Sequence, residues 1–147
     1  MIVGGVAAAL HGNPRVTFDL DLVPSLDPDS WAAAVDLLWS LGARPRISEP
    51  LKRIRDVEQI RRWQTEKGML ALNFRTPDGS VEVDLLVSES DQIEELRQRA
   101  IPITLDTGTF FVASIDDLIA MKQRAGRPQD LLDIAQLQDI KKRRANP

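Results

Sequence analysis

The chain has 147 residues, of which 43% are hydrophobic and 28% charged, and its formal net charge is −3. These values are those of one soluble globular domain, and the acidic balance excludes wholesale wrapping of nucleic acid while leaving room for a local basic face. The absence of cysteine excludes disulfides and thiolate metal sites, and a single histidine excludes the usual zinc sites. No apolar stretch of membrane-spanning length and no cationic signal sequence occur, which predicts a cytoplasmic protein.

The N-terminal part of the sequence predicts a strand, a helix and a second strand, in that order. Residues 1–3 form the end of the first strand, and residues 5–10 form a helix whose N-terminal amides favour phosphate. An apolar run at residues 18–23 predicts a buried strand. His11, just before Gly12, is interpreted as a helix-end residue that favours the helix dipole, with a substrate-facing role as the alternative.

Two stretches of different character follow. Residues 30–41 predict a helix capped by Asp29 and ended by Gly42. Residues 50–67 are basic and contain Trp63; we favour a solvated helix with one packed tryptophan over a nucleic-acid contact, because acidic residues dilute the charge. The apolar residues of the first helix recur at helical spacing and are predicted to enter the core: Trp31, Val35, Leu38 and Trp39.

A hairpin, a helix and two short strands are predicted next. The hairpin consists of residues 69–75 and 81–87, which are joined by a Thr-Pro-Asp-Gly turn and pair in an antiparallel direction. A helix over residues 89–99 then leads to two short strands at residues 101–105 and 109–112.

The C-terminal part, about residues 114–144, is predicted to be helical. Ser114 and Asp117 resemble a capping box that starts a helix ending near Ala125, and a last helix begins after Pro128. The basic run at residues 141–144 follows the apparent end of that helix. It is interpreted as a solvated tail, with an RNA contact as the alternative.

The Asp-Leu-Asp motif at residues 19–21 is the strongest chemical signal in the chain. Strand side chains alternate, so Asp19 and Asp21 point to one face while Leu20 points to the other. Two adjacent carboxylates resist joint ionisation unless a cation lies between them, and oxygen ligands suit Mg²⁺ or Mn²⁺. The motif therefore predicts half of a metal site.

Asp84 is the candidate for the third carboxylate. It lies in the middle of the second hairpin strand, which could pair beside the strand of Asp19 and Asp21. Three carboxylates holding two divalent ions roughly 3.5–4 Å apart would clamp the attacking and leaving oxygens of a phosphoryl displacement. The chemistry indicated is phosphoryl or nucleotidyl transfer.

The order Gly-Gly, helix, Asp-x-Asp strand and later strand aspartate resembles the DNA polymerase beta-type nucleotidyltransferase superfamily. Within it, residues 3–12 and 14–21 are similar to AbiEii-like toxins and related minimal nucleotidyltransferase families. Residues 112–122 and 125–131, together with Asp133, look like the C-terminal helical part of those proteins. One departure is Val6, which stands where many active members have a serine that contacts the triphosphate.

The resemblance implies an α+β (α/β-like) nucleotidyltransferase fold, with a mixed β-sheet flanked by helices and C-terminal helices, in a single domain over residues 1–147. It implies that Asp19, Asp21 and Asp84 are both catalytic residues and ligands of Mg²⁺ or Mn²⁺. The implied nucleotide-binding residues are Gly4, Gly5, Arg15, Thr17, Lys122 and Arg127.

For the last two of these residues, spacing alone favours a plainer role. A surface Lys122 and an interhelical pair between Arg127 and Asp130 would explain the same residues without a nucleotide.

The implied reaction moves a nucleoside monophosphate from a nucleoside triphosphate to a hydroxyl of a tRNA 3′ end or of a protein; a small molecule is a third possible acceptor. The protein would be the toxin of a toxin–antitoxin system, with an antitoxin as a partner and no membrane involved. The alternatives are a catalytically inactive binding or regulatory module of the same fold, and a metal-dependent phosphatase or nuclease that hydrolyses its substrate.

Overall fold

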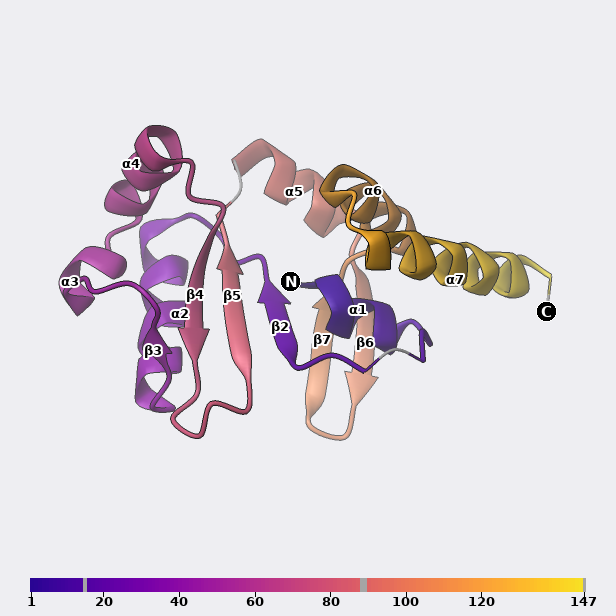
Figure 1. Cartoon of the computed structure of the whole chain (residues 1–147), viewed down its shortest axis with the longest axis horizontal. Coiled ribbons are helices and arrows are strands. Elements are labelled where there is room, and N and C mark those ends of the chain that lie inside the picture. Colours follow the sequence, from indigo (N-terminus) through magenta and orange to yellow (C-terminus); the bar gives the residue numbers. More distant parts are fainter. Residues whose placement is uncertain (15, 88–89, 147) are drawn as a thin grey trace. The chain divides into compact units, whose positions relative to one another are not determined.

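The computed structural model describes residues 1–14, 16–87 and 90–146. This part of the chain contains seven strands and seven helices, and the strands pair in both parallel and antiparallel directions, so the α+β class with mixed strand pairing is confirmed (Figure 1). The chain divides into two compact units, which we name by their place in the sequence: a central unit, Phe18–Glu94, and a terminal unit, Met1–Thr17 with Glu95–Pro147. The prediction of a single domain over the whole chain stays a prediction.

The central unit contains four strands in the order β3-β4-β5-β2. The predicted hairpin is confirmed, because β4 and β5 pair in an antiparallel direction. Strand β2 pairs with β5 in parallel, so Asp84 does lie on the strand next to the Asp-Leu-Asp motif. The strand bounds are Asp19–Leu22 for β2, Arg44–Pro45 for β3, Ala71–Arg75 for β4 and Glu82–Leu86 for β5.

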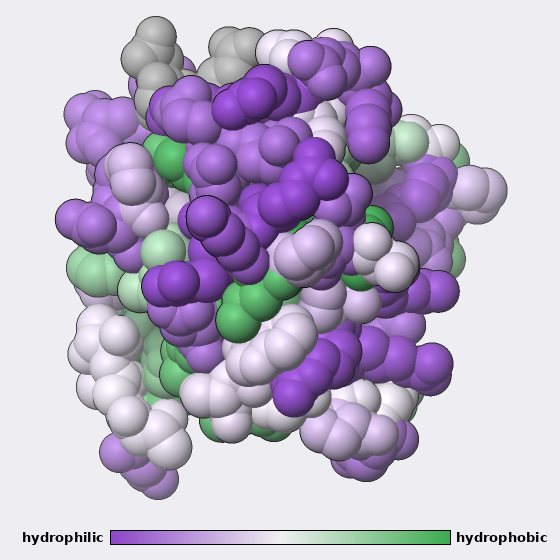
Figure 2. Space-filling view, turned by 90° about the vertical axis from the view of Figure 1, so that its left-hand side faces the viewer, coloured by the Kyte–Doolittle hydropathy of each residue, from purple (hydrophilic) through white to green (hydrophobic). Residues whose placement is uncertain are grey.

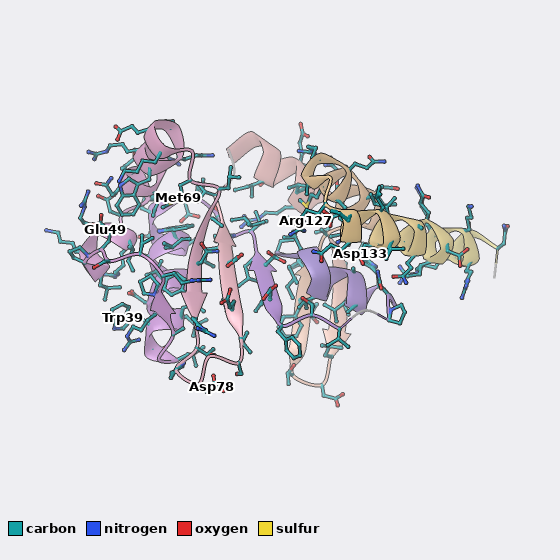
Figure 3. The ribbon with its side chains drawn as sticks, in the orientation of Figure 1. Trp39, Glu49, Met69, Asp78, Arg127 and Asp133 are labelled. Carbon is teal, nitrogen blue, oxygen red and sulfur yellow. The ribbon has the colours of Figure 1, made fainter. Side chains whose placement is uncertain are left out.

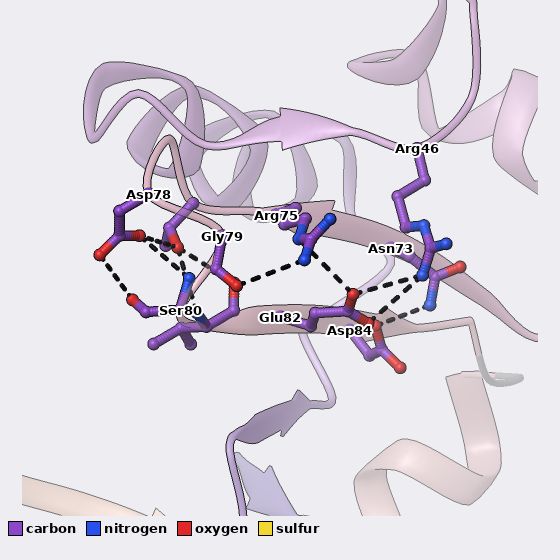
Figure 4. A network of polar contacts seen from close by, with 10 residues as sticks. Arg46, Asn73, Arg75, Asp78, Gly79, Ser80, Glu82 and Asp84 are labelled. Atoms are coloured by element: carbon purple, nitrogen blue, oxygen red, sulfur yellow. Dashed lines mark hydrogen bonds and ion pairs between the residues drawn. The ribbon is translucent and has the colours of Figure 1, made fainter.

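The turn of this hairpin is held by Asp78 (Figure 4). The hydroxyl of Thr76 donates to Asp78 Oδ1 at 2.6 Å, and Ser80 donates its backbone N–H to the same oxygen at 3.1 Å. The Ser80 hydroxyl also donates to Asp78 Oδ2 at 2.7 Å, and these hydrogen bonds, that from Thr76 first, lower the pKa of Asp78 to about 2. Gly79 has φ +70°, a conformation that glycine adopts without strain.

Helix α2, Pro28–Ser40, begins two residues before its predicted start. Its N-cap is Asp27, whose Oδ1 accepts the Ser30 N–H at 2.8 Å, so the prediction of Asp29 as the cap was wrong. Proline at the first helical position suits this start because its missing N–H would have no helical partner there. Trp31, Val35 and Leu38 are buried as predicted. Trp39 is only half-buried, and the guanidinium of Arg44 lies over its ring at 4.1 Å.

The basic stretch forms two helices, α3 (Leu51–Ile54) and α4 (Val57–Lys67). Trp63 is 2% exposed, which confirms the packed tryptophan, and two cations, Arg53 and Lys67, lie over its ring. Arg53 also pairs with a glutamate at 2.7 Å. The side of the molecule that carries α2, α3 and α4 is mostly hydrophilic (Figure 2).

The terminal unit contains three strands in the order β1-β7-β6 and the remaining helices. Strand β1 pairs with β7 in parallel, and β6 pairs with β7 in an antiparallel direction. The bounds are Ile2–Val3 for β1, Ile101–Leu105 for β6, Gly108–Val112 for β7, Gly4–Leu10 for α1, Ile115–Ala125 for α6 and Pro128–Ala145 for α7, while α5, Ser90–Gln98, belongs to both units.

Two C-terminal predictions had different outcomes. The predicted start of α6 at Ser114 is confirmed, since Ser114 is its N-cap and Ser114 Oγ accepts the Asp117 N–H at 3.1 Å. The basic run at residues 141–144 lies inside α7 and does not form a tail beyond it. Across the described ranges, every helix is too short or too polar to cross a membrane. The predicted start of α5 at residue 89 lies outside the described residues.

Candidate functional site

One face of the central sheet carries four carboxylates. In the parallel pairing of β2 with β5, Asp19 is the Cα partner of Glu82, and Asp21 is the Cα partner of Asp84. Residues in register on neighbouring strands share a face of the sheet. The structure therefore brings Asp19, Asp21 and Asp84 to one face as predicted, and it adds Glu82, which sequence reasoning missed.

The opposite face of the same strands is apolar and supports this arrangement. Val83 and Leu85 of β5 are 5% and 1% exposed. Leu20 and Leu22 of β2 are half-buried, and Val23 is buried as predicted. Phe18, just before β2, is 72% exposed, so the prediction of a buried strand over residues 18–23 was wrong at Phe18. Alternation along both strands thus presents the carboxylates on the polar side.

Strand β4 adds a third member to each pair of carboxylates. Asn73 is in register with Asp84, and Arg75 is in register with Glu82. Two rows therefore cross the sheet from β4 to β2: an amide row of Asn73, Asp84 and Asp21, and an arginine row of Arg75, Glu82 and Asp19. The β4 and β5 members of both rows lie side by side in Figure 4.

The two β5 carboxylates have different partners. Glu82 faces two guanidinium groups: Arg46 Nη1 lies 3.3 Å from Oε1 and 3.4 Å from Oε2, and Arg75 Nε lies 3.9 Å from Oε1. Asp84 instead accepts a hydrogen bond from the neutral amide of Asn73, with Nδ2 at 2.6 Å from Oδ1. The charge of Glu82 is therefore compensated by arginines, whereas the partner of Asp84 brings no charge.

The donor set has the chemistry that a divalent cation requires. Carboxylate oxygens are the preferred ligands of Mg²⁺ and Mn²⁺, and the amide row supplies two of them in register, from Asp21 and Asp84, with Asp19 on the same face. In the described ranges, no three acidic, histidine or cysteine side chains lie close enough together to form a ready-made metal cluster. The assignment of Asp19, Asp21 and Asp84 as ligands of such an ion stays a prediction.

Backbone conformation and packing within the terminal unit account for the two glycines at the start of α1. Gly4 has φ +66°, which disfavours any other residue, and the helix begins there without a side-chain cap. A Cβ on Gly5 would lie 2.9 Å from Thr17 Oγ1, so the side chain of Thr17 leaves no room for a larger residue at this position. Phosphate binding by Gly4, Gly5 and Thr17 stays a prediction, and Arg15 lies outside the described residues.

Lys122 and Arg127 take part in an ion cluster between α6 and α7. Lys122 Nζ lies 2.5 Å from Asp133 Oδ2 and 3.5 Å from Asp130 Oδ1, and Arg127 Nε lies 2.9 Å from Asp130 Oδ2. Lys122 is 5% exposed, so the alternative of a surface lysine is wrong. The Arg127–Asp130 pair is present, but it lies at the start of α7, where Arg127 is the N-cap, and is not interhelical. The hydrogen bonds from Arg127 hold the pKa of Asp130 below its usual value. Figure 3 labels Arg127 and Asp133 at this junction. A nucleotide contact by either cation stays a prediction.

His11 is buried in the terminal unit, at the end of α1. Its Nε2 lies 2.8 Å from the Ala113 carbonyl oxygen, and Arg144 of α7 lies 3.3 Å from Nδ1 and donates to the His11 carbonyl oxygen at 3.0 Å. These partners fit a neutral ring that donates from Nε2 and accepts at Nδ1. Burial lowers the pKa of His11, Arg144 lowers it further, and the bond to Ala113 opposes both.

Comparison with known proteins adds no further constraint on this site. Neither a scan against protein-family models nor a search of curated proteins finds a match to the chain.

Proposed function

We propose that the protein is a metal-dependent nucleotidyltransferase. The observation that carries the proposal is the register of β2 with β5, which sets Asp21 beside Asp84 and puts Asp19 on the same face. This register lies within the central unit. The resemblance of the Gly-Gly, Asp-x-Asp and strand-aspartate order to the polymerase beta-type superfamily gives the reaction class.

In the proposed reaction the acceptor hydroxyl oxygen forms a bond to the α-phosphorus of a nucleoside triphosphate. The bond from that phosphorus to the bridging oxygen breaks, and pyrophosphate leaves. Asp19, Asp21 and Asp84 would hold the divalent cations, and Asp84 also takes the hydroxyl proton. When bound, Mg²⁺ or Mn²⁺ supplies neutralisation of the phosphate charge.

The acceptor is a hydroxyl of a tRNA 3′ end or of a protein, as in toxin–antitoxin pairs. Both basic stretches that could favour RNA have intramolecular partners: Arg61 pairs with Glu58, and Arg143 pairs with Asp139. Both pairs are largely exposed, and exposed ion pairs contribute little to stability, so neither pair argues for or against RNA. The labelling experiment described next therefore has to identify the acceptor.

Incubation with each α-³²P-labelled nucleoside triphosphate, Mg²⁺ or Mn²⁺, and separate RNA and protein fractions tests the proposal. We expect label on one fraction and release of pyrophosphate, and we expect Asp21→Asn and Asp84→Asn to lose both. The Asp78→Asn variant is a matched control, because it changes an aspartate of the same hairpin that holds only the turn. Hydrolysis without a labelled acceptor would identify a phosphatase or nuclease instead.

A non-catalytic binding module is the second candidate, and Val6 is the observation that favours it. A valine at this position cannot donate the hydroxyl hydrogen bond that the resembling enzymes make to the triphosphate. This candidate has lost productive triphosphate binding, so it predicts that a nucleoside triphosphate with Mg²⁺ leaves the melting temperature unchanged and that no label is transferred. Transfer in the experiment above would exclude it.

A further inference from the structure

Asn73 holds a position in the amide row that the proposed reaction does not yet use. Its side chain is half-buried, and its Nδ2 donates to Asp84 Oδ1 at 2.6 Å. On the other side of Asp84, in register on β2, lies Asp21. Neighbouring strands are about 4.8 Å apart, and like charges placed directly opposite each other are unfavourable. Asp84 thus lies between a donor and a second carboxylate.

The arginine row provides a comparison, because its β5 carboxylate has charged partners instead of an amide. Glu82 occupies the same strand and face as Asp84, two residues earlier, and it is paired with Arg46 and Arg75. No lysine or arginine pairs with Asp84 in the described part of the chain, where its hydrogen bond comes from Asn73. An amide fixes a carboxylate oxygen without neutralising it, so the negative charge of Asp84 remains available to a cation.

We propose that Asn73 is the positioning residue of Asp84 and that, through this bond, it tunes the affinity of the face for a divalent cation. The inference rests on the proposed function, because it concerns the same carboxylates. Partners in the outer shell of a metal site orient the ligands, and their loss commonly weakens metal binding by roughly 10- to 100-fold. Without Asn73, the Asp84 carboxylate would lose the hydrogen bond that fixes its place in the row.

Direct binding of Mn²⁺, followed by electron paramagnetic resonance of the unbound ion, tests this without reference to activity. We expect Asn73→Ala to weaken Mn²⁺ binding by roughly 10-fold or more relative to the unsubstituted chain. In the transfer assay, the same variant should need a correspondingly higher Mn²⁺ concentration for half-maximal rate, with much of the rate recovered at saturating Mn²⁺.

A matched control separates positioning from a structural role. Thr76→Val removes a polar side chain from the end of the same strand, where it bonds Asp78 and the Val81 backbone. This control should lower the melting temperature and leave Mn²⁺ affinity unchanged. If Asn73→Ala does not fold, Asn73→Thr replaces it: its β-branched side chain suits a strand, its hydroxyl is too short to replace the amide, and the same loss is expected.

The possible outcomes separate this inference from the proposed function. An Asn73→Ala variant that melts earlier but binds Mn²⁺ as tightly as the unsubstituted chain would overturn the inference and leave nucleotidyl transfer intact. Mn²⁺ binding that depends on Asn73, in a chain that transfers no nucleotide, would support the inference and remove the proposed reaction. A chain that binds no Mn²⁺ at all would overturn both.

Discussion

Two groups of aspartates in this protein are in opposite physical situations. In the terminal unit, Asp130 and Asp133 are 0% and 3% exposed and are bound to Lys122, itself 5% exposed. In the central unit, the carboxylates of β2 and β5 share one face of a sheet, where Asp19 is exposed, the other three are half-buried, and Asp21 and Asp84 are in register. In the first group positive charge compensates the carboxylates inside the protein. In the second group two negative charges are adjacent.

The difference indicates what each group can do. A buried lysine that is bound to two carboxylates contributes to the join between helices, and releasing it would leave buried charge without compensation. Two carboxylates in register on neighbouring strands do not stabilise the fold in this way, because like charges directly opposite each other lower stability. Residues that weaken the fold while lying in an ordered array are candidates for function. The central face is therefore the better candidate site.

The largest predicted effect breaks the buried cluster. The substitution Lys122→Met removes the ammonium between α6 and α7 and leaves Asp133 buried without its cation, which should lower the free energy of unfolding by about 3 kcal/mol. Urea denaturation measures this loss. The double variant Lys122→Met/Asp133→Leu should recover much of it, because the buried carboxylate that lost the ammonium is then removed as well.

A second ion pair between the same two helices provides the control. Lys141 Nζ also lies 2.5 Å from its partner, Asp116 Oδ1, but the two side chains are 56% and 67% exposed. Exposed pairs contribute roughly 0.2–1 kcal/mol, so Lys141→Met should cost less than about 1 kcal/mol. Equal losses for the two lysines would show that burial does not distinguish the two pairs.

Local signals in the sequence predicted much of the fold. The hairpin of β4 and β5 follows from alternating side chains and a Thr-Pro-Asp-Gly turn, and the start of α6 follows from Ser114, because these signals act within a few residues. Near Asp27 the local signal was ambiguous, since either Asp27 or Asp29 can cap a helix. The proline between them favours the earlier start.

Features that depend on contacts between distant parts of the chain were not predicted, for a physical reason. The burial of Lys122 depends on how α6 packs on α7, and spacing along the chain does not determine that packing. The positions of Glu82 and Asn73 could have been predicted from the sequence. Glu82 lies two residues before Asp84 on the same strand, so alternation places it on the same face. Asn73 lies on the other strand of the hairpin, where antiparallel pairing sets it opposite Asp84.

A smaller effect concerns pH and His11. Its pKa is lowered from the ordinary value of 6.5 by burial and by Arg144, so the unfolded chain takes up the proton first as the pH falls. The native state then binds fewer protons than the unfolded state, and stability is lost as the pH falls below 6.5 through the lowered pKa, while it is fully present above 6.5. The effect is limited because the Nε2 bond to Ala113 survives protonation.

Urea denaturation at several pH values between 7.5 and 5 measures this dependence. The variant His11→Gln cannot take up this proton, so its stability should fall less steeply over the interval than that of the unsubstituted chain. Other titrating groups are common to both proteins and cancel in the difference between them. Parallel curves would contradict a buried neutral His11.

The smallest predicted effect is an increase in stability, and it tests the carboxylate-bearing face of the central sheet directly. In the metal-free protein, Asp84→Asn removes one of two in-register negative charges and keeps an oxygen that accepts from Asn73, so stability should rise by up to about 1 kcal/mol. Saturating Mg²⁺ should stabilise the unsubstituted chain and not the variant, because only the unsubstituted chain can share the ion between Asp21 and Asp84. Melting curves with and without Mg²⁺ provide both comparisons. If Asp84→Asn destabilised the metal-free protein as Lys122→Met does, the carboxylate would be part of the fold and the distinction between the two groups of aspartates would fail.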